Sequence, residues 1–218
     1  MPKRFELLVF DWDGTLMDSA AAIAGSLQAA CRDLGLPVPS DESARFIIGL
    51  GLNDAMAHVL PELAQPQYPL VAERYRHHFM LRDGGTTLFP GAAETVKELH
   101  ASGFMLAVAT GKSRRGLDRA LSTTGLESYF HATRCADEGF TKPHPGMLEE
   151  LMALLGVAQD KTLMIGDTTH DMAMAKHARV ARLAAAYGAH ARRELLAFEP
   201  VACVEGIAEL REWLLANA

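Results

Sequence analysis

Hydrophobic residues form short unbroken runs along most of the chain, and stretches with an apolar residue at every third or fourth position separate these runs. Unbroken runs predict buried strands, and the spaced pattern predicts amphipathic helices. The predicted strands occupy residues 5–10, 104–111, 130–138, 161–167 and 180–186. The predicted helices that alternate with them occupy residues 91–103, 113–125, 144–156, 168–178 and 207–218. This alternation predicts a parallel sheet with helices on both faces.

One long stretch breaks the alternation. Between residues 17 and 85 the helical spacing recurs about four times without a strand pattern, beginning with an apolar stripe that includes Ile23 and Leu27. Because the strand at 5–10 belongs to the sheet, this helical block interrupts one α/β unit rather than preceding it. The predicted domains are a core of residues 1–16 and 86–218 and an inserted helical domain of residues 17–85.

The composition is that of an ordinary globular protein. Of 218 residues, 49% are hydrophobic and 22% are charged. The formal net charge of −6 offers no basic surface for nucleic acid, and no apolar run reaches the ~18 residues of a membrane span. The three cysteines are far apart, which fits free thiols better than disulfides or a zinc site. We therefore expect a cytoplasmic protein, monomeric or homodimeric, without nucleic-acid or membrane partners.

Two aspartates lie two residues apart directly after the first predicted strand, in the sequence FDWDGTL. Carboxylates this close repel each other and resist dehydration, so they require a cation, a proton or a catalytic role. A calcium loop of the EF-hand type has glycine at its sixth position, whereas Gly14 is fourth when Asp11 is counted as first. The pair formed by Asp11 and Asp13 is therefore a candidate site of another kind.

Polar residues also follow the other predicted strands. The second strand ends in Thr110 and Gly111, Lys142 follows the third, and Asp167 ends the fourth, with Asp171 four residues further on. The carboxyl ends of parallel strands meet at one edge of a sheet, and ligands bind there near the point where the strand order reverses. These residues are therefore predicted to form one site together with the aspartate pair.

Each of these residues also has a simpler interpretation. The sequence GKS at 111–113 resembles the end of a phosphate-binding P-loop, but Leu106 occupies a position where that motif requires glycine. Thr168 and Asp171 have the spacing of a helix capping box, so Asp171 could serve only to begin a helix. A single lysine such as Lys142 is usually solvated at the surface. Only the combination at one sheet edge favours a functional site.

The four motifs DWDGTL, VATGKS, TKPHP and GDTTHD, in this order, resemble those of the haloacid dehalogenase-like hydrolases. The similarity extends over essentially the whole chain, and PGAAETVKELHASG and KPHPGMLEEL are most similar to phosphoglycolate phosphatases. The resemblance implies an α/β fold: a Rossmann-like parallel sheet in a three-layer α/β/α core, with an inserted α-helical cap. Arg179 departs from the family pattern, because relatives often have glycine there.

The resemblance also implies a role for each candidate residue. Asp11 would attack phosphorus and form an aspartyl-phosphate intermediate, while Asp13 would protonate the leaving alcohol and later deprotonate water. Thr110, Gly111 and Lys142 would bind the phosphoryl group through hydrogen bonds and fixed positive charge. The opening pair of carboxylates is thus interpreted as a nucleophile and a proton shuttle.

A metal ion is expected from the sum of charges. Several aspartates and a phosphate dianion would meet a single lysine, and Mg²⁺ is the usual cation for all-oxygen ligands. The resemblance implies that the carboxylates of Asp11 and Asp167 and the backbone carbonyl of Asp13 are ligands. It leaves open whether Asp171 is a further ligand or contacts one.

Other reactions occur among proteins of this type. Dehalogenases lack the second aspartate, and phosphonoacetaldehyde hydrolases use a cap lysine; this chain has Asp13 and no lysine between Lys3 and Lys97. A sugar-phosphate mutase or a pyrophosphatase is the enzymatic alternative. A phospho-receiver-like module or a catalytically dead binding protein is the alternative without enzymatic activity.

The expected substrate is a small phosphorylated metabolite similar to 2-phosphoglycolate, because a compact cap favours a small phosphomonoester. Arg45 is a candidate for binding a substrate carboxylate, although a solvated helix arginine explains it equally well. The sequence IIGLGLND at 47–54 is predicted to be the part of the cap that faces the core.

Overall fold

A computed structural model describes residues 3–83 and 85–218 of the chain. Six parallel strands form one sheet in the order β3-β2-β1-β4-β5-β6, which confirms the predicted parallel α/β core. The strands are β1 (Leu7–Phe10), β2 (Met105–Thr110), β3 (Ala132–Cys135), β4 (Thr162–Gly166), β5 (Ala181–Ala185) and β6 (Ala202–Val204). The strand order reverses between β1 and β4, so the edge where these two strands end is the expected place for a ligand.

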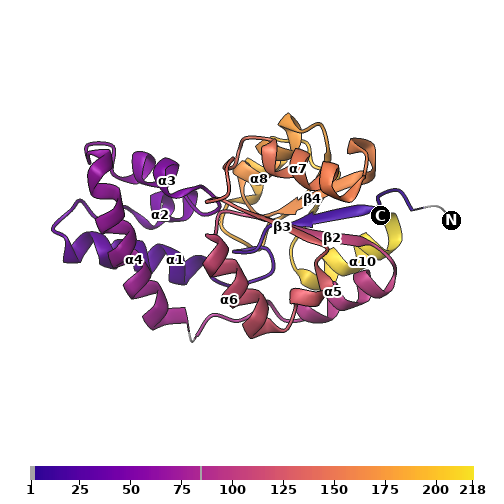
Figure 1. Cartoon of the computed structure of the whole chain (residues 1–218), viewed down its shortest axis with the longest axis horizontal. Coiled ribbons are helices and arrows are strands. Elements are labelled where there is room, and N and C mark those ends of the chain that lie inside the picture. The colour runs from indigo at the N-terminus through magenta and orange to yellow at the C-terminus, as the bar shows by residue number, and fades with distance from the viewer. Residues whose placement is uncertain (1–2, 84) are drawn as a thin grey trace.

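Helices cover both faces of the sheet, and Figure 1 shows them as two separate layers. Side chains alternate between the faces of a strand, so Leu8 and Phe10 pack on one side while Leu7 and Val9 pack on the other. The first layer contains α5 (Ala92–Ala101), α6 (Arg114–Thr124) and α10 (Ile207–Asn217). The second layer contains α7 (Gly146–Leu155) and α8 (Thr169–His177), with α9 (Arg192–Leu196) packed against α8.

Between β1 and α5, the described residues form four α-helices that make a separate group at one end of the molecule (Figure 1). They are α1 (Ala20–Asp33), α2 (Asp41–Phe46), α3 (Leu52–Val59) and α4 (Tyr68–Asp83). This group has its own apolar cluster, in which Leu27 of α1, Met56 of α3 and Val71 of α4 are buried. We call this group the cap.

The chain enters and leaves the cap through two segments that lie side by side. Met17 forms an isolated β-bridge with Leu88, and the Asp18 N–H donates to the Thr87 carbonyl over 2.9 Å. These contacts lie close to the predicted domain boundaries, which stay a prediction. Residues 1 and 2 of the predicted core and residue 84 of the predicted cap lie outside the described residues.

The hydrophobic pattern does not predict α9 and β6. Both elements are short, and β6 contributes only the sequence ACV, of which Val204 alone is fully buried. Such a segment has too few residues for a periodicity to show. The Ala186 N–H donates to the Val204 carbonyl, so β6 adds to the far edge of the sheet and does not reach the candidate site.

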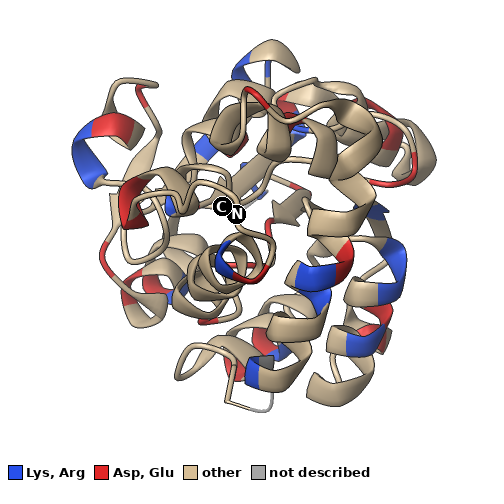
Figure 2. Ribbon diagram, turned by 90° about the vertical axis from the view of Figure 1, so that its left-hand side faces the viewer, with Lys and Arg blue, Asp and Glu red and all other residues tan. Residues whose placement is uncertain are grey.

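Acidic and basic segments are interspersed over the helices that face the viewer at the cap end of the molecule (Figure 2). Within the described part of the chain, no helix combines the length and the apolar character needed to cross a bilayer.

Candidate active site

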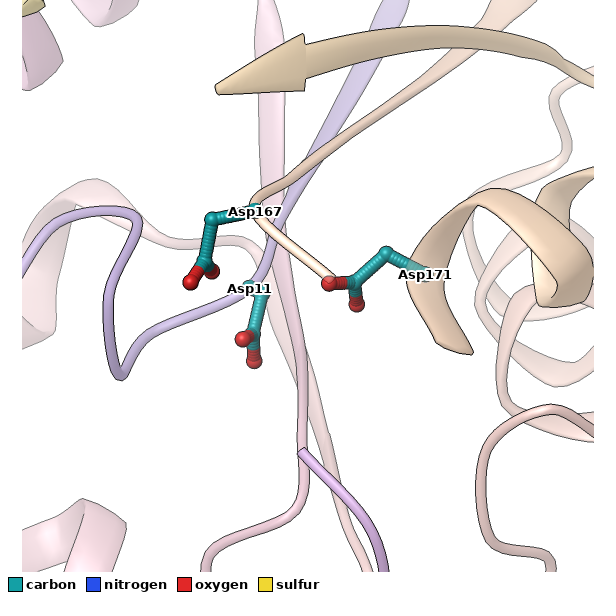
Figure 3. A group of neighbouring side chains, drawn as sticks. All are labelled: Asp11, Asp167 and Asp171. Atoms are coloured by element: carbon teal, nitrogen blue, oxygen red, sulfur yellow. The ribbon is translucent and has the colours of Figure 1, made fainter. Parts of the chain in front are cut away.

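Three aspartates meet at the edge where β1 and β4 end. Asp11 follows β1, Asp167 follows β4, and Asp171 lies in the first turn of α8. Figure 3 shows their carboxyl groups close together, and one oxygen from each lies within 4.8 Å of the others. All three side chains are fully buried. The predicted convergence of these residues on one site is therefore what the structure shows.

Lys142 lies among these carboxylates. Its Nζ atom is 2.7 Å from Asp11 Oδ1 and 2.6 Å from Asp171 Oδ1, and the whole residue is buried. The interpretation of Lys142 as a solvated surface lysine is therefore wrong. The physical reason is electrostatic: a buried ammonium requires partners of opposite charge, and two carboxylates supply them.

Three buried aspartates surround one lysine, and this excess of acids favours the protonated form of the carboxyl groups. Burial, reinforced by repulsion from Asp171 and only partly offset by Lys142, raises the pKa of Asp11 to about 7. Burial and repulsion from Asp11 and Asp171 raise the pKa of Asp167 well above its usual range. Burial alone would lower the pKa of Lys142, but attraction to Asp11 and Asp171 outweighs it and raises that pKa. The site thus lacks positive charge when its carboxyls ionise.

The two carboxylate oxygens of Asp171 have different partners. Oδ2 accepts hydrogen bonds from the Thr168 N–H (3.0 Å) and hydroxyl (2.7 Å). The first of these and the bond from the Asp171 N–H to the Thr168 hydroxyl (3.2 Å) form the predicted capping box at the start of α8. Oδ1 contacts Lys142. Asp171 therefore begins a helix and also fixes the lysine, so the interpretation that it serves only to begin a helix is incomplete.

Asp167 is held from both sides. Its Oδ1 accepts from the Thr15 hydroxyl over 2.7 Å, and its Oδ2 accepts from the Ala189 N–H over 2.7 Å. A Cβ atom added to Gly14 or to Gly188 would lie 2.1 or 2.2 Å from Asp167 Oδ2, so only glycine allows the backbone to approach this closely. Tight packing and two donors fix the direction in which this carboxylate points.

Asp13 lies two residues after Asp11, in the segment between β1 and α1. Its Oδ1 accepts from the Ser19 hydroxyl over 2.6 Å and from Lys112 Nζ over 2.9 Å. Thr110, at the end of β2, is fully buried, and its hydroxyl accepts from the Lys112 N–H over 3.2 Å. Gly111 lies between Thr110 and Lys112 in the sequence. The roles assigned to Asp13, Thr110 and Gly111 stay predictions.

The segment between α2 and α3 lies against the core, as predicted for residues 47–54. A Cβ added to Gly111 would be 2.6 Å from the backbone of Gly49, and one added to Gly51 would be 2.5 Å from Thr141. Across this contact the Thr141 hydroxyl donates to Asp54 of α3 over 2.9 Å. The cap therefore covers the buried carboxylates, with backbone against backbone at Gly49 and Gly111.

Two buried histidines of the core hold the end of α2. The Phe46 carbonyl accepts from His170 Nε2 over 2.7 Å and from His190 Nε2 over 3.1 Å. The Thr169 N–H donates to His190 Nδ1, which leaves the proton of a neutral His190 on Nε2. Burial lowers the pKa of both histidines, so each is neutral near pH 7.

Sequence reasoning missed some residues of the site and left others undecided. It did not predict the contacts of Thr15, Ser19 and Lys112, although Thr15 and Lys112 lie inside the motifs DWDGTL and VATGKS. Arg45 pairs with Asp41 of its own helix over 2.8 Å, so its role in substrate binding stays a prediction. Membership of a motif was the available signal for Thr15 and Lys112.

The donor set fits a small divalent cation. Asp11 Oδ2 is buried and has no hydrogen-bond partner within the described residues, and Asp167 lies beside it. Carboxylate oxygens are the ligands that Mg²⁺ prefers, and a cation here would offset the excess of negative charge. Asp11 and Asp167 are the residues best placed to hold it, because Asp171 already contacts Lys142 and Thr168.

Sequence comparisons agree with this geometry. Residues 8–185 match the family described as haloacid dehalogenase-like hydrolase. The chain is 36% identical to a protein of Dickeya dadantii named probable phosphatase IndB, over 94% of this chain and 91% of that protein. It is 29% identical to the phosphoglycolate phosphatase of Vibrio vulnificus over 99% of both chains. It is also 29% identical to the pyrophosphatase PpaX of Anoxybacillus flavithermus, over 93% of this chain and 94% of that one.

Solved structures share the whole fold. A hydrolase from Pseudomonas syringae superposes with a TM-score of 0.89 at 20% identity, covering 98% of this chain and 99% of the other. A predicted phosphatase from Clostridium acetobutylicum gives a TM-score of 0.86 at 23% identity, covering 97% and 99%. Both matches include the cap as well as the sheet, since nearly all of each chain is covered.

Proposed function

This chain belongs to the haloacid dehalogenase-like hydrolase family, and we propose that it is a Mg²⁺-dependent phosphatase that cleaves a small phosphomonoester such as 2-phosphoglycolate. One observation carries the proposal. A buried carboxylate oxygen without a hydrogen-bond partner within the described residues, Asp11 Oδ2, lies beside a fixed ammonium group, with a second carboxylate, Asp13, two residues further along the chain. That arrangement supplies a nucleophile, positive charge for a phosphoryl group and a proton carrier.

The first half-reaction transfers the phosphoryl group to the enzyme. A carboxylate oxygen of Asp11 attacks phosphorus, the bond from phosphorus to the ester oxygen breaks, and Asp13 gives its proton to the departing alkoxide. Lys142 and Thr110 stabilise the charge on the phosphoryl oxygens. A bound Mg²⁺ ion would neutralise further charge on the phosphoryl oxygens and would be held by Asp11, Asp167 and the Asp13 carbonyl.

The second half-reaction restores the enzyme. Asp13, now ionised, takes a proton from water as the water oxygen attacks phosphorus of the aspartyl phosphate. The bond between phosphorus and Asp11 breaks, inorganic phosphate leaves, and Asp13 again carries the proton. The cap covers the buried carboxylates and would therefore exclude bulk water while Asp11 is phosphorylated.

A phosphate-release screen tests the proposal. Purified protein is assayed with a panel of phosphomonoesters, p-nitrophenyl phosphate and pyrophosphate, in Mg²⁺ and in excess EDTA. We expect Mg²⁺-dependent release with the highest kcat/KM for a small phosphomonoester. A higher kcat/KM for pyrophosphate would favour the activity named for the Anoxybacillus relative, and full activity in EDTA would contradict the metal assignment.

The nucleophile is tested with Asp11→Asn. Its amide has a similar shape but does not attack phosphorus, so activity should fall at least ~10³-fold while circular dichroism stays unchanged. Asp160→Asn is the matched control, because Asp160 is an exposed aspartate outside the site and should tolerate the same change. More than a few per cent of activity left in Asp11→Asn would exclude the covalent mechanism.

A further inference from the structure

Lys112 is a second lysine in contact with a catalytic carboxylate, and the phosphoryl-transfer steps above do not use it. Its Nζ atom lies 2.9 Å from Asp13 Oδ1 and 5.1 Å from the centre of the Phe79 ring on α4 of the cap. The Lys112 side chain is 14% exposed. The ammonium group therefore lies between core and cap, on the side of Asp13 that faces the cap.

The position of Lys112 defines which part of a substrate it meets. Lys142 contacts Asp11 and so marks the phosphoryl side of the site. Asp13 must reach the ester oxygen that leaves, so its immediate neighbours surround the leaving group. Lys112 is such a neighbour, and its Nζ atom lies 5.1 Å from the centre of the Phe79 ring of the cap. A substrate's leaving group therefore lies within reach of the Lys112 ammonium.

The Lys112 ammonium is largely buried between core and cap, where a positive charge requires partners of opposite charge. An ammonium has three N–H donors, and Asp13 Oδ1 accepts from one of them. An anionic group on the substrate would accept from a further donor and compensate the charge, whereas a cationic leaving group would be repelled.

We infer that Lys112 selects substrates whose leaving group carries a negative charge, such as a carboxylate or a second phosphate. This inference rests on the proposed phosphatase function and adds the charge class of the substrate to it. It also assigns recognition of that charge to the core residue Lys112 rather than to Arg45, whose guanidinium pairs with Asp41. Hydrogen bonds between charged partners typically change affinity by ~10- to 100-fold.

Three phosphate esters of similar size test the inference: 2-phosphoglycolate has an anionic leaving group, ethyl phosphate a neutral one and phosphoethanolamine a cationic one. Wild-type protein should prefer them in that order by kcat/KM. Lys112→Met keeps the length and apolar stem of the side chain without its charge. It should lower the preference for 2-phosphoglycolate over ethyl phosphate ~10- to 100-fold, chiefly through KM.

Two further variants separate recognition from positioning. Lys112→Arg keeps the positive charge and should keep the substrate order, whereas Lys97→Met removes an exposed lysine of α5 and should leave all three rates unchanged. Equal losses on all three esters in Lys112→Met would show that Lys112 only positions Asp13, and would overturn the inference. A wild-type protein that prefers ethyl phosphate would also overturn it. Failure to hydrolyse any ester, including p-nitrophenyl phosphate, would instead overturn the proposed function itself.

Discussion

At the scale of single residues, the site concentrates charge that opposes folding. Asp11, Asp167 and Asp171 are fully buried around one lysine, and burial raises the pKa of Asp11 to about 7. Groups that must ionise in the interior for catalysis cost stability until a partner neutralises them. The same groups that would hold a cation and a phosphate therefore make the metal-free protein sensitive to pH.

This sensitivity has a defined sign. The pKa of Asp11 is raised from 3.8 in the unfolded chain to about 7 in the folded one, so the folded state binds more protons between these values. Stability therefore falls as pH rises from about 4, and the fall levels off once the folded carboxyl is fully ionised, at about pH 8. The lowered pKa values of His170 and His190 act in the opposite sense, but only at pH values below about 6.5.

Thermal melts in EDTA should therefore show a Tm that falls between pH 6.5 and 8. Mg²⁺ should raise Tm more at pH 8 than at pH 6.5, because at pH 8 fewer protons must leave the buried carboxyl groups when the ion binds. Asp11→Asn removes the titrating carboxyl and should flatten the profile. A Tm in EDTA that rises across this range would contradict the assignment of a buried, protonated carboxyl group.

Arg179 allows a second prediction at this scale. It follows α8 with φ +57°, a left-handed conformation that suits glycine, and the Val180 N–H closes the turn onto the Ala175 carbonyl. Arg179 is exposed, so its side chain has no role in the core. Arg179→Gly should raise the free energy of unfolding by about 1 kcal/mol in urea titrations, without changing activity. A loss of stability would show that the arginine side chain matters more than the backbone strain.

At the scale of elements, the contact between cap and core depends on glycine. The backbone of Gly49 lies against Gly111, where a Cβ atom would approach to 2.6 Å. Asp11 and Lys142 are fully buried beneath this contact, so substrate entry requires the cap to move away. The His170 and His190 hydrogen bonds to the Phe46 carbonyl would break and re-form in each cycle.

Gly111→Ala tests this contact. The added methyl group should hold the cap away from the core and lower kcat/KM at least ~10-fold, because a small misplacement of the groups that surround the substrate slows the reaction. Gly206→Ala is the matched control, since a Cβ there meets no atom within 4 Å. Unchanged kinetics in Gly111→Ala would show that the cap need not approach this closely during turnover.

The hydrophobic pattern predicts an element more clearly when the element is longer and more completely buried. The strands β1, β2 and β4 are buried along almost their whole length, and an unbroken apolar run predicts each of them. The three residues of β6 are too few to stand out, and neighbouring strands rather than their own sequence place them in the sheet. For the same reason the pairing of Lys112 with Asp13, 99 residues apart, is set by the tertiary fold and not by local sequence.

At the scale of the whole molecule, the sheet and the inserted cap contribute different residues to the candidate site. The parallel strand order brings Asp11 and Asp167 together from segments more than 150 residues apart, and this convergence follows from sequence motifs and sheet topology alone. The cap contributes Phe46, Gly49 and Phe79 to the surroundings of that site. Which groups from the cap reach the core depends on how the two bodies meet, and a hydrophobic pattern carries no information about that.

The central claim is that Asp11 becomes phosphorylated during turnover, and trapping this intermediate tests it most directly. In Asp13→Asn, p-nitrophenyl phosphate should still transfer its phosphoryl group, because nitrophenolate leaves without a proton, whereas hydrolysis of the intermediate lacks its base. Acid quenching in the first turnovers, followed by peptide mass spectrometry, should find one phosphoryl group on Asp11, with a burst of nitrophenol approaching one equivalent. The double variant Asp11→Asn, Asp13→Asn should show neither. A phosphoryl group on another residue, or nitrophenol release without a modified protein, would contradict the account.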